Sequence, residues 1–511
     1  MDMLVRGKYV ITDPLKKAQG ILTDGAVYLS DGTIREVDDY QTLKAKYPDA
    51  PFKGNGNQLL MPGLIDGHSH GWGLTATQRG VNNDFLENCF LDWAMMLNLD
   101  PELNSMMSAI RHLRSGCTTL HHNNWGEESN LAEISEKVIR GYEKIGIRWA
   151  FSLGVRSTNI LAYNDTEFFT TLPADLQAFF RPLVFNDKRA IAKRYFELFE
   201  HLYSTYNGAE RRVIFGPSWA MGSTDEFLQR VKARADELGK LQIHIHTLQT
   251  PLQKAYGLKT YGKSLLAHLD DIGLVDENLT LGHAVFVNEA DIELLATNNA
   301  SITHHPSCNL SVRNGICPVY YLHKAGVNVA LGIDDKGIND DEDAIMELRL
   351  IHKLHRVSGF DLANTPALDA FDVLQMGTVN AARVSGFAGD VGAITPRMKA
   401  DLILVDLEEI MEDPWMSPNL NIAEIFIHRA KGQHVNTAIV GGKVIMEDRQ
   451  FSQVDVEALY DEVRNQAAKG ISPEQQHVAE MLQKLRPYYH AWYQGWEKLE
   501  FEPFYVMNSR K

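Results

Sequence analysis

The chain has 511 residues, of which 44% are hydrophobic, and a formal net charge of −16 at pH 7. This length can bury a large core, as one large domain with appendages or as two to three smaller domains. The acidic balance argues against nucleic acid or an anionic membrane surface as a partner. No run approaches the roughly 18 apolar residues of a membrane span. Acidic residues also stand too early for a secretory signal, so we expect a cytoplasmic protein.

The four cysteines, Cys89, Cys117, Cys308 and Cys317, lie far apart and form no Cys-x-x-Cys pair. Such spacing is typical of a reducing compartment and excludes a cysteine-rich zinc module. Cys308 follows two histidines and a proline, a context that also suits a nucleophile. We favour the interpretation of a buried, inert thiol.

The two ends of the chain, residues 1–60 and 396–450, share a strand-rich texture. In the first segment, Asp24-Gly25 and Asp31-Gly32 predict turns between short apolar runs, and Gly441-Gly442 predicts a turn in the second. Chain ends in compact folds usually lie close together. We therefore expect the two segments to pair into one small β-sandwich.

The middle of the chain, residues 61–395, alternates apolar runs with helical patterns. Helical periodicity covers residues 103–115, 130–145, 224–238 and 288–297. Eight apolar runs predict strands, at 64–65, 118–120, 148–153, 212–215, 241–245, 279–281, 300–303 and 327–332. Together they predict an α/β fold, a (β/α)8 barrel of the TIM type, with functional residues at the carboxyl ends of the strands. A doubly wound sheet is the competing fold, but no Gly-x-Gly-x-x-Gly opens the first helix.

The last segment, residues 451–511, becomes polar and helical and then aromatic, with Tyr489, Trp492 and Trp496 among its rings. Aromatic residues at helical spacing usually pack on a neighbouring surface rather than line a cofactor site. We expect a helical extension that helps fold closure or dimerisation. A homodimer or a higher homo-oligomer is therefore the predicted assembly.

Histidines stand at several predicted strand ends. His68 and His70 end the first strand, and residues two apart in a strand point to the same face, so both can reach one metal ion. A His-x-His pair is weak evidence by itself, and the chain holds a second pair at His244 and His246. The later predicted strand ends add His283, His304, His305, Asp334 and Asp335. This order of ligand-type residues is hard to explain as packing.

The motifs around these histidines resemble the amidohydrolase superfamily. Within it, the chain is most similar to the branch of aminohydrolases and triazine chlorohydrolases that also holds cytosine, guanine and S-adenosylhomocysteine deaminases. The resemblance covers nearly the whole chain up to residue 450. It rests on PGLIDGHSH at 62–70, Gln78-Arg79-Gly80, Gly116–Thr119, Leu281-Gly282-His283, HHPSCNL at 304–310 and Leu331–Asp334.

The resemblance implies one divalent metal ion per chain, zinc in most members, with iron or manganese as alternatives. Its ligands would be His68, His70, His246 and Asp334. A bound divalent ion lowers the pKa of a water towards 7. Asp334 would take the proton of the attacking water, and His283 would orient the water and stabilise the oxyanion.

Two neighbours of these residues offer alternatives to the ligand assignments. His244 lies one layer deeper than His246, and we interpret it as a core residue or as support for the ligands. Asp335 follows Asp334 directly, and we interpret it as solvated or as a supporting residue.

Gln249 departs from the deaminase pattern. Three residues after the histidine of the fifth strand, the deaminases carry a glutamate that moves protons, whereas an amide hydrogen-bonds without exchanging a proton. Three explanations stay open. Asp334 and His283 handle all proton transfer, the leaving group needs less help, or another acid such as Asp84 or Glu87 takes this place in space.

Substrate contacts are expected from residues just past the predicted strand ends. We select seven candidates, which are Trp72, Gln78, Asn124, Arg156, Trp219, His304 and Asn309. Trp125 and Met221 also lie just past predicted strand ends, but we do not select them. Aromatic and amide side chains suit a flat pocket for a planar heterocycle, so we expect a small-molecule substrate.

The leading hypothesis is a metal-dependent hydrolase that displaces an amino or related leaving group from a nitrogen heterocycle, with Gln249 in its active site. The alternative is hydrolysis of a C–N bond in an aryl amide, carbamate or urea, for which Gln249 is less costly. A remote alternative is a non-catalytic barrel used as an assembly module.

Overall fold

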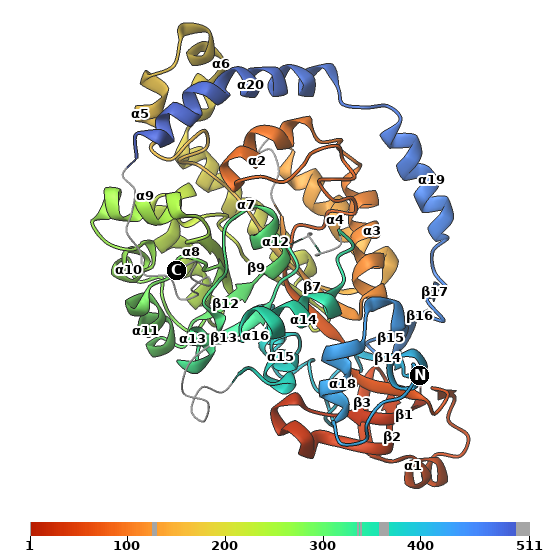
Figure 1. Ribbon diagram of the computed structural model, residues 1–511. Helices are drawn as coiled ribbons and strands as arrows, with labels where there is room; N and C mark the ends of the chain where they lie inside the picture. The colour runs from red at the N-terminus through yellow and green to blue at the C-terminus, as the bar shows by residue number, and fades with distance from the viewer. Residues whose placement is uncertain (1, 125–129, 335–336, 338–339, 357–366, 497–511) are drawn as a thin grey trace.

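Two sheets organise the protein. The computed structural model describes residues 2–124, 130–334, 337, 340–356 and 367–496. Within this part of the chain, an eight-stranded parallel sheet forms the centre of the molecule and a nine-stranded mixed sheet lies at one end of it (Figure 1).

The parallel sheet runs in chain order from β6 to β13, with every neighbouring pair parallel. Nearly all residues of these strands are buried, because helices cover the outer face and side chains fill the interior. The predicted barrel is therefore confirmed. Its strands are β6 (Leu64–Ser69), β7 (Cys117–Asn124), β8 (Arg148–Leu153), β9 (Arg211–Phe215), β10 (Ile243–Thr247), β11 (Leu279–His283), β12 (Ser301–His304) and β13 (Asn328–Leu331).

The first and last strands of the barrel meet at their carboxyl ends. The backbone N–H of Asp334 donates to the carbonyl oxygen of His68 at 2.9 Å. Gly67 permits the approach, because a Cβ atom there would lie 2.8 Å from the carbonyl oxygen of Leu331. This closure brings the two ends of the predicted ligand set together.

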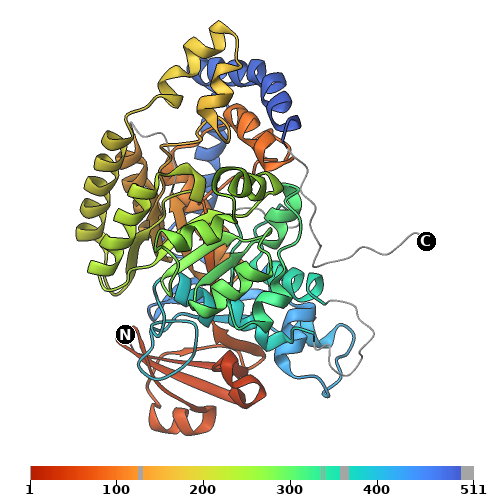
Figure 2. The ribbon, with the colours of Figure 1, turned by 90° about the vertical axis from the view of Figure 1, so that its left-hand side faces the viewer.

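Helices surround the barrel between its strands (Figure 2). The four helices predicted from periodicity begin and end within two residues of the predicted positions. They are α3 (Pro101–Arg114), α4 (Leu131–Ile145), α8 (Asp225–Glu237) and α11 (Glu289–Thr297). Further helices around the barrel are α7 (Lys188–Tyr206), α9 (Pro251–Tyr261), α10 (Leu265–Asp271), α12 (Pro306–Ser311), α13 (Val319–Lys324), α14 (Ala344–Leu354), α15 (Ala370–Met376) and α16 (Val379–Val384).

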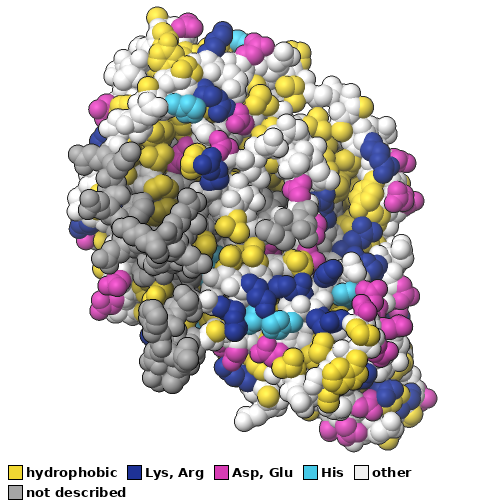
Figure 3. All heavy atoms as spheres, in the orientation of Figure 1, with side chains coloured by type: hydrophobic (Ala, Val, Ile, Leu, Met, Phe, Trp, Pro, Cys, Tyr) yellow, Lys and Arg dark blue, Asp and Glu magenta, His cyan; other side chains and the backbone are white. Residues whose placement is uncertain are grey.

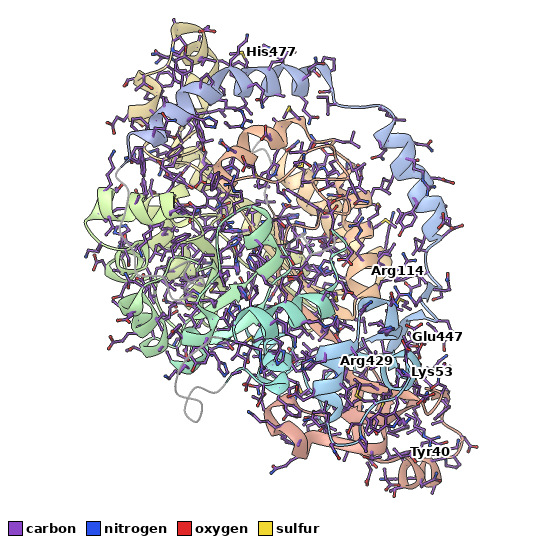
Figure 4. The ribbon with its side chains drawn as sticks, in the orientation of Figure 1. Tyr40, Lys53, Arg114, Arg429, Glu447 and His477 are labelled. Carbon is purple, nitrogen blue, oxygen red and sulfur yellow. The ribbon has the colours of Figure 1, made fainter. Side chains whose placement is uncertain are left out.

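The two flanking segments pair with each other, as predicted, and the structure joins them in one nine-stranded sheet. Strand β5 pairs with β1 in parallel and with β14 in antiparallel orientation. The ion pair between Lys53 and Glu447, with Nζ 2.6 Å from Oε1, also connects the two segments (Figure 4). The strands are β1 (Met3–Ile11), β2 (Ile21–Ser30), β3 (Thr33–Asp39), β4 (Phe52–Lys53), β5 (Gln58–Pro62), β14 (Leu402–Asp406), β15 (Val435–Val440), β16 (Lys443–Glu447) and β17 (Gln450–Phe451).

The predicted turn at Asp24-Gly25 is wrong, because both residues lie inside β2. The connection from β1 to β2 is instead a 3-10 segment, Pro14–Gly20. A Cβ atom at Gly25 would lie 2.8 Å from Cγ2 of Val10. This glycine therefore marks a close approach between two strands rather than a turn.

The C-terminal extension forms two helices, α19 (Val456–Ala467) and α20 (Pro473–Gln494). Helix α20 lies at the end of the barrel opposite the mixed sheet, over α2 (Leu86–Asp92) and α6 (Ala174–Val184) (Figures 1 and 2). Its Leu485 and Tyr489 pack with Phe168 in one apolar cluster, and His477 contacts the ring of Phe179 (Figure 4). The aromatic residues of this helix pack on a neighbouring surface, as predicted. Within the described residues, no helix combines the length and the apolar character needed to cross a membrane.

Candidate metal centre and active site

The predicted metal ligands converge at the carboxyl ends of the barrel strands. His68 is on β6, His70 follows it, His246 is on β10, and Asp334 follows β13. The Nε2 atoms of His246 and His68 are 3.2 Å apart. Asp334 Oδ1 lies 3.2 Å from Nε2 of His70 and 3.6 Å from Nε2 of His68. The ligand atoms of His68, His70 and His246 therefore lie within 4.8 Å of one another, and the carboxylate of Asp334 contacts two of these three rings.

The outer nitrogens of two of these rings are fixed by the backbone. Nδ1 of His70 lies 2.9 Å from the carbonyl oxygen of Asn123, and Nδ1 of His246 lies 2.7 Å from that of Ser218. A carbonyl oxygen only accepts, so each Nδ1 carries the hydrogen, and the neutral ring presents a lone pair on Nε2 to the cluster. Burial lowers the pKa of His246 well below its usual range, so this ring is neutral at pH 7.

The ring of His68 is held between two other imidazoles. His244 and His305 stack on its two faces, each with ring centroids 4.6 Å away. His244 is fully buried, and neither of its nitrogens has a hydrogen-bond partner among the described residues. His244 was interpreted from the sequence as a core residue or as support for the ligands, and both its burial and its stacking on His68 are compatible with that interpretation. Burial also lowers the pKa of His68 to about 3, so its imidazole is uncharged at pH 7, the form that binds a metal ion.

His283 and Asp334 both have left-handed backbone conformations, with φ of 72° and 56°. Residues with a Cβ atom rarely adopt this region, and such strain concentrates at functional sites. Nε2 of His283 lies 3.8 Å from Oδ2 of Asp334. Its Nδ1 donates to Oδ1 of Asn309 at 3.0 Å. Asn309, predicted as a substrate contact, thus orients His283.

Cys308 is buried, as predicted, but it also contacts the site. Its Sγ lies 2.7 Å from Oδ2 of Asp334, so the thiol donates a hydrogen bond to this carboxylate. The contact depends on the turn between β12 and α12, which sequence spacing does not define. Sequence analysis missed this role.

A buried ion pair behind the site was also missed. Oδ1 of Asp66 accepts from the backbone N–H of His68 at 3.0 Å and from that of Ile333 at 2.9 Å. Its Oδ2 lies 2.9 Å from Nε2 of His112 on α3. Burial by itself would lower the pKa of His112, but the carboxylate raises it to about 9. Burial raises the pKa of Asp66, and the contact with His112 acts in the opposite direction. Asp66 therefore connects the backbone N–H groups of His68 and of Ile333, the residue before Asp334, to His112.

A small cavity lies above the ligand cluster, beneath α2. Its volume of about 20 Å³ has room for about one water molecule, so a heterocycle needs the covering side chains to move. Trp219 and Gln249, both predicted site residues, line it. The full lining is His70, Leu86, Phe90, Trp93, Trp219, His246, Gln249, His283, Cys308, Val312 and Asp334.

The other predicted substrate contacts lie around this cavity rather than in its wall. The guanidinium of Arg156 lies over the ring of Trp219, 4.7 Å from its centroid, and Trp72 contacts Trp93 edge to face at 5.5 Å. Both stand behind the aromatic wall.

The remaining candidates hold loops or pack deeper. Gln78 accepts from Arg111 at 2.7 Å, and Asn124 donates to Ser135 at 3.0 Å. Nε2 of His304 lies 2.9 Å from Nε2 of His355, away from the cavity. Trp125 and Asp335 lie outside the described residues.

The two acids considered as replacements for the deaminase glutamate differ in their surroundings. Asp84 is partly exposed and pairs with Arg313 at 2.8 Å. Glu87 is only 6% exposed and accepts a hydrogen bond from Thr250, the residue after Gln249, at 2.6 Å. Only Glu87 lies close to the position of Gln249.

A further histidine group lies outside the barrel mouth. His352 on α14, with Glu424 and His428 on α18 (Ile422–Arg429), places ligand-type atoms within 4.8 Å of one another. Nζ of Lys353 lies 3.1 Å from Nδ1 of His428, and Lys, Arg and His side chains gather on this face near Arg429 (Figures 3 and 4). A neighbouring ammonium group disfavours a second cation there.

The chain matches the amidohydrolase family over residues 59–445, most of its length, and it belongs to this family. A 5-methylthioadenosine/S-adenosylhomocysteine deaminase of Caldanaerobacter subterraneus subsp. tengcongensis is 29% identical over 477 residues, which cover 91% of this chain and 98% of the relative. The predicted resemblance is thus confirmed.

Solved structures agree with the fold. An adenosine deaminase of Xanthomonas campestris with bound zinc superposes with a TM-score of 0.74 at 26% identity, covering 92% of this chain and 98% of that one. An atrazine chlorohydrolase of Arthrobacter aurescens complexed with zinc has a TM-score of 0.73 at 20% identity, with 91% and 99% covered, and supports the fold alone. The chain is a metal-dependent hydrolase of carbon–nitrogen bonds other than peptide bonds.

Proposed function

We propose that the chain hydrolyses the bond between a nitrogen heterocycle and an amino or related leaving group, with a metal-activated water as the nucleophile. The observation that carries the proposal is the cluster of His68, His70 and His246 at the barrel mouth, with Asp334 Oδ1 3.2 Å from Nε2 of His70 and 3.6 Å from Nε2 of His68. The relatives named above as deaminases of adenosine compounds support this reaction class.

One divalent ion would be held by His68, His70, His246 and Asp334. Neutral imidazoles with one carboxylate form a donor set that suits zinc better than the harder manganese ion, with iron as the second choice. The bound zinc in the adenosine deaminase structure supports the same choice. When bound, the ion supplies a water whose pKa is close to 7.

Proton transfer from the water is assigned to Asp334 and His283. Oδ2 of Asp334 lies at the cavity wall and is held by the Cys308 thiol, which leaves it placed to take a proton. The Nδ1 hydrogen of His283 is bound by Asn309, so its Nε2 faces Asp334 and can orient the water. Once protonated, the same ring stabilises negative charge that develops on the substrate.

Substrate recognition is assigned to the cavity lining. Phe90 and Trp219, with ring centroids 4.9 Å apart, provide flat apolar faces for a planar ring. The Gln249 amide both donates and accepts hydrogen bonds, which suits the alternating donors and acceptors at the edge of a nitrogen heterocycle.

Gln249 also favours a second candidate function. Hydrolysis of an aryl amide, carbamate or urea C–N bond proceeds through a carbonyl carbon and needs no proton on a ring nitrogen. An amide at position 249 then reduces the reaction rate less than it would in a deaminase, because no proton has to be moved to a ring nitrogen.

The test is to incubate the zinc-loaded protein with aminated purines, pyrimidines and triazines and with aryl ureas and carbamates, while ammonia and aryl amine release are measured. We expect ammonia from at least one heterocycle and none with Asp334→Asn. Release of aryl amine alone would favour the second candidate. Release of neither product would contradict both.

We also infer that the protein is a cytoplasmic homo-oligomer. None of the four cysteines forms a disulfide and all four are buried, which fits a reducing compartment. Trp415 is 71% exposed and Leu420 is 52% exposed on one loop, and large exposed apolar side chains of this kind favour a subunit contact. Light scattering should give a mass of at least two chains, reduced in Trp415→Ser; a monomeric native protein would contradict the inference.

A further inference from the structure

We infer that Glu87 is the acid that protonates the leaving group, the role that a glutamate at the position of Gln249 plays in the deaminases that the chain resembles. The inference rests on the proposed function and deepens it. It starts from the geometry of α2, which covers the cavity above the ligand cluster. Leu86 and Phe90 of this helix line the cavity together with Gln249. Glu87 is not itself in the lining; it lies behind this wall, with its carboxyl group against Thr250, the residue after Gln249.

The carboxyl group of Glu87 is buried against the loop that follows β10. Oε1 accepts a hydrogen bond from the Thr250 hydroxyl at 2.6 Å and another from the Tyr163 hydroxyl at 3.1 Å. Thr250 directly follows Gln249, so the carboxyl group stands beside the position that lacks one. Among the described residues, no Lys or Arg lies within ion-pair distance of it.

These surroundings favour the protonated acid. Burial in a setting with only neutral partners disfavours the carboxylate and raises the pKa of Glu87 above its usual range, although the two hydroxyl groups partly offset this. Both hydroxyls donate their hydrogen bonds to Oε1, so the proton of the acid form is on Oε2. A neutral carboxylic acid can donate that proton, which the amide of Gln249 does not do at useful pH.

The framework around Glu87 is held by α20. The Tyr493 hydroxyl accepts from the backbone N–H of Tyr163 at 3.0 Å, and Nε1 of Trp492 donates to the carbonyl oxygen of Tyr163 at 3.0 Å. Gln475 binds the carbonyl oxygens of Ala94 and Met96, just after α2, at 2.9 and 2.6 Å. The C-terminal extension therefore fixes both the helix that carries the acid and the tyrosine that binds it.

The proton balance is complete with groups already assigned. The water oxygen bonds to the substrate carbon while Asp334 takes one of the water protons. The C–N bond breaks as Oε2 of Glu87 gives its proton to the leaving nitrogen. Asp334 then releases its proton to solvent and Glu87 takes up one proton, so each cycle consumes one water and releases one amine.

The first experiment uses the full-length, zinc-loaded protein and the best substrate from the panel above. Glu87→Gln keeps an acceptor for both hydroxyls but has no acidic proton. We expect kcat to fall about 100-fold, with little change in KM, zinc content or Tm. Asp84→Asn, which alters a partly exposed acid just before α2, should leave kcat unchanged.

The second experiment returns the carboxyl group to position 249. The double variant Glu87→Gln/Gln249→Glu should have a kcat at least about tenfold higher than that of Glu87→Gln, because position 249 then supplies the acid. No recovery in this double variant would contradict the exchange of roles between the two positions.

A spectroscopic readout is independent of turnover. The infrared spectrum at pH 7 should show a protonated carboxyl band that is missing in Glu87→Gln. Absence of this band in the native protein, or a kcat within about threefold of native in Glu87→Gln, would overturn the assignment. So would a Glu87→Gln variant that loses zinc and activity together. Native protein that binds zinc but releases no amine from any compound would instead contradict the proposed function, and this role with it.

Discussion

Two carboxylates at the barrel mouth, Asp334 and Asp66, are buried beside histidines, yet their surroundings differ. Asp66 has one imidazole, His112, and two backbone N–H donors, and the pKa of His112 is raised to about 9. Asp334 lies within 4 Å of four imidazoles, those of His68, His70, His283 and His305.

The two carboxylates differ in whether the protein itself supplies a neighbouring positive charge. Asp66 and His112 form a pair that supplies its own positive charge. Around Asp334, burial lowers the pKa of His68 to about 3 and the pKa of His305 well below its usual range, so these two rings carry no charge at pH 7. A buried carboxylate among neutral lone pairs is stabilised by an external cation. We therefore expect the Asp334 region to depend on a metal ion and the Asp66 region to be independent of one.

The largest effect is expected from Asp334→Asn. The variant removes a charged ligand and the group that takes the water proton, so kcat should fall at least about 1,000-fold and zinc affinity should fall with it. Steady-state kinetics and chelator competition measure the two effects. Native zinc affinity in this variant would show that Asp334 is not a ligand.

Asp66→Asn tests the pair formed by Asp66 and His112, which we expect to be independent of a metal ion. The change removes the carboxylate that keeps buried His112 protonated, and loss of one partner of such a pair costs roughly 3–5 kcal/mol of folding free energy. Because Asp66 also holds the backbone N–H of His68, zinc affinity should drop about 10- to 100-fold. Denaturant unfolding and chelator competition check both numbers.

The matched control for that variant is Asp66→Asn/His112→Gln, which removes both charges. It should recover part of the lost stability. Stability equal to that of Asp66→Asn alone would contradict a charged pair.

The pair also predicts a pH dependence of stability. The pKa of His112 rises from its usual value of 6.5 to about 9 on folding, so its contribution is fully present below about pH 6.5 and is lost as pH rises through 9. The free energy of unfolding should decline by roughly 3 kcal/mol over this window. His112→Gln should lack this part of the slope; an identical slope in both proteins would refute the charged state.

The smallest effect is expected at Cys308. Cys308→Ser keeps a donor to Oδ2 of Asp334, so zinc affinity and kcat should stay within about threefold of native. Cys308→Ala removes the donor and should weaken zinc binding by about tenfold. Equal affinities in the two variants would mean that the thiol contact does not matter.

Much of this arrangement could be predicted from the sequence, because it depends on local patterns. Buried apolar runs placed the barrel strands, and period-two spacing placed His68 and His70 on one face. Asp66 was not recognised, because its partner is on α3, 46 residues away. Gln78 and Asn124 were predicted as substrate contacts, but in the structure Gln78 binds Arg111 and Asn124 binds Ser135. Such contacts are decided by packing that no short sequence pattern records.

The most direct test is metal content, measured by elemental analysis of the native protein, His246→Ala and His352→Gln after purification with zinc. The account predicts about one zinc per chain in the native protein, little or none in His246→Ala and an unchanged value in His352→Gln. Two equivalents in the native protein, or equal zinc in native and His246→Ala, would contradict a single ion at the barrel mouth.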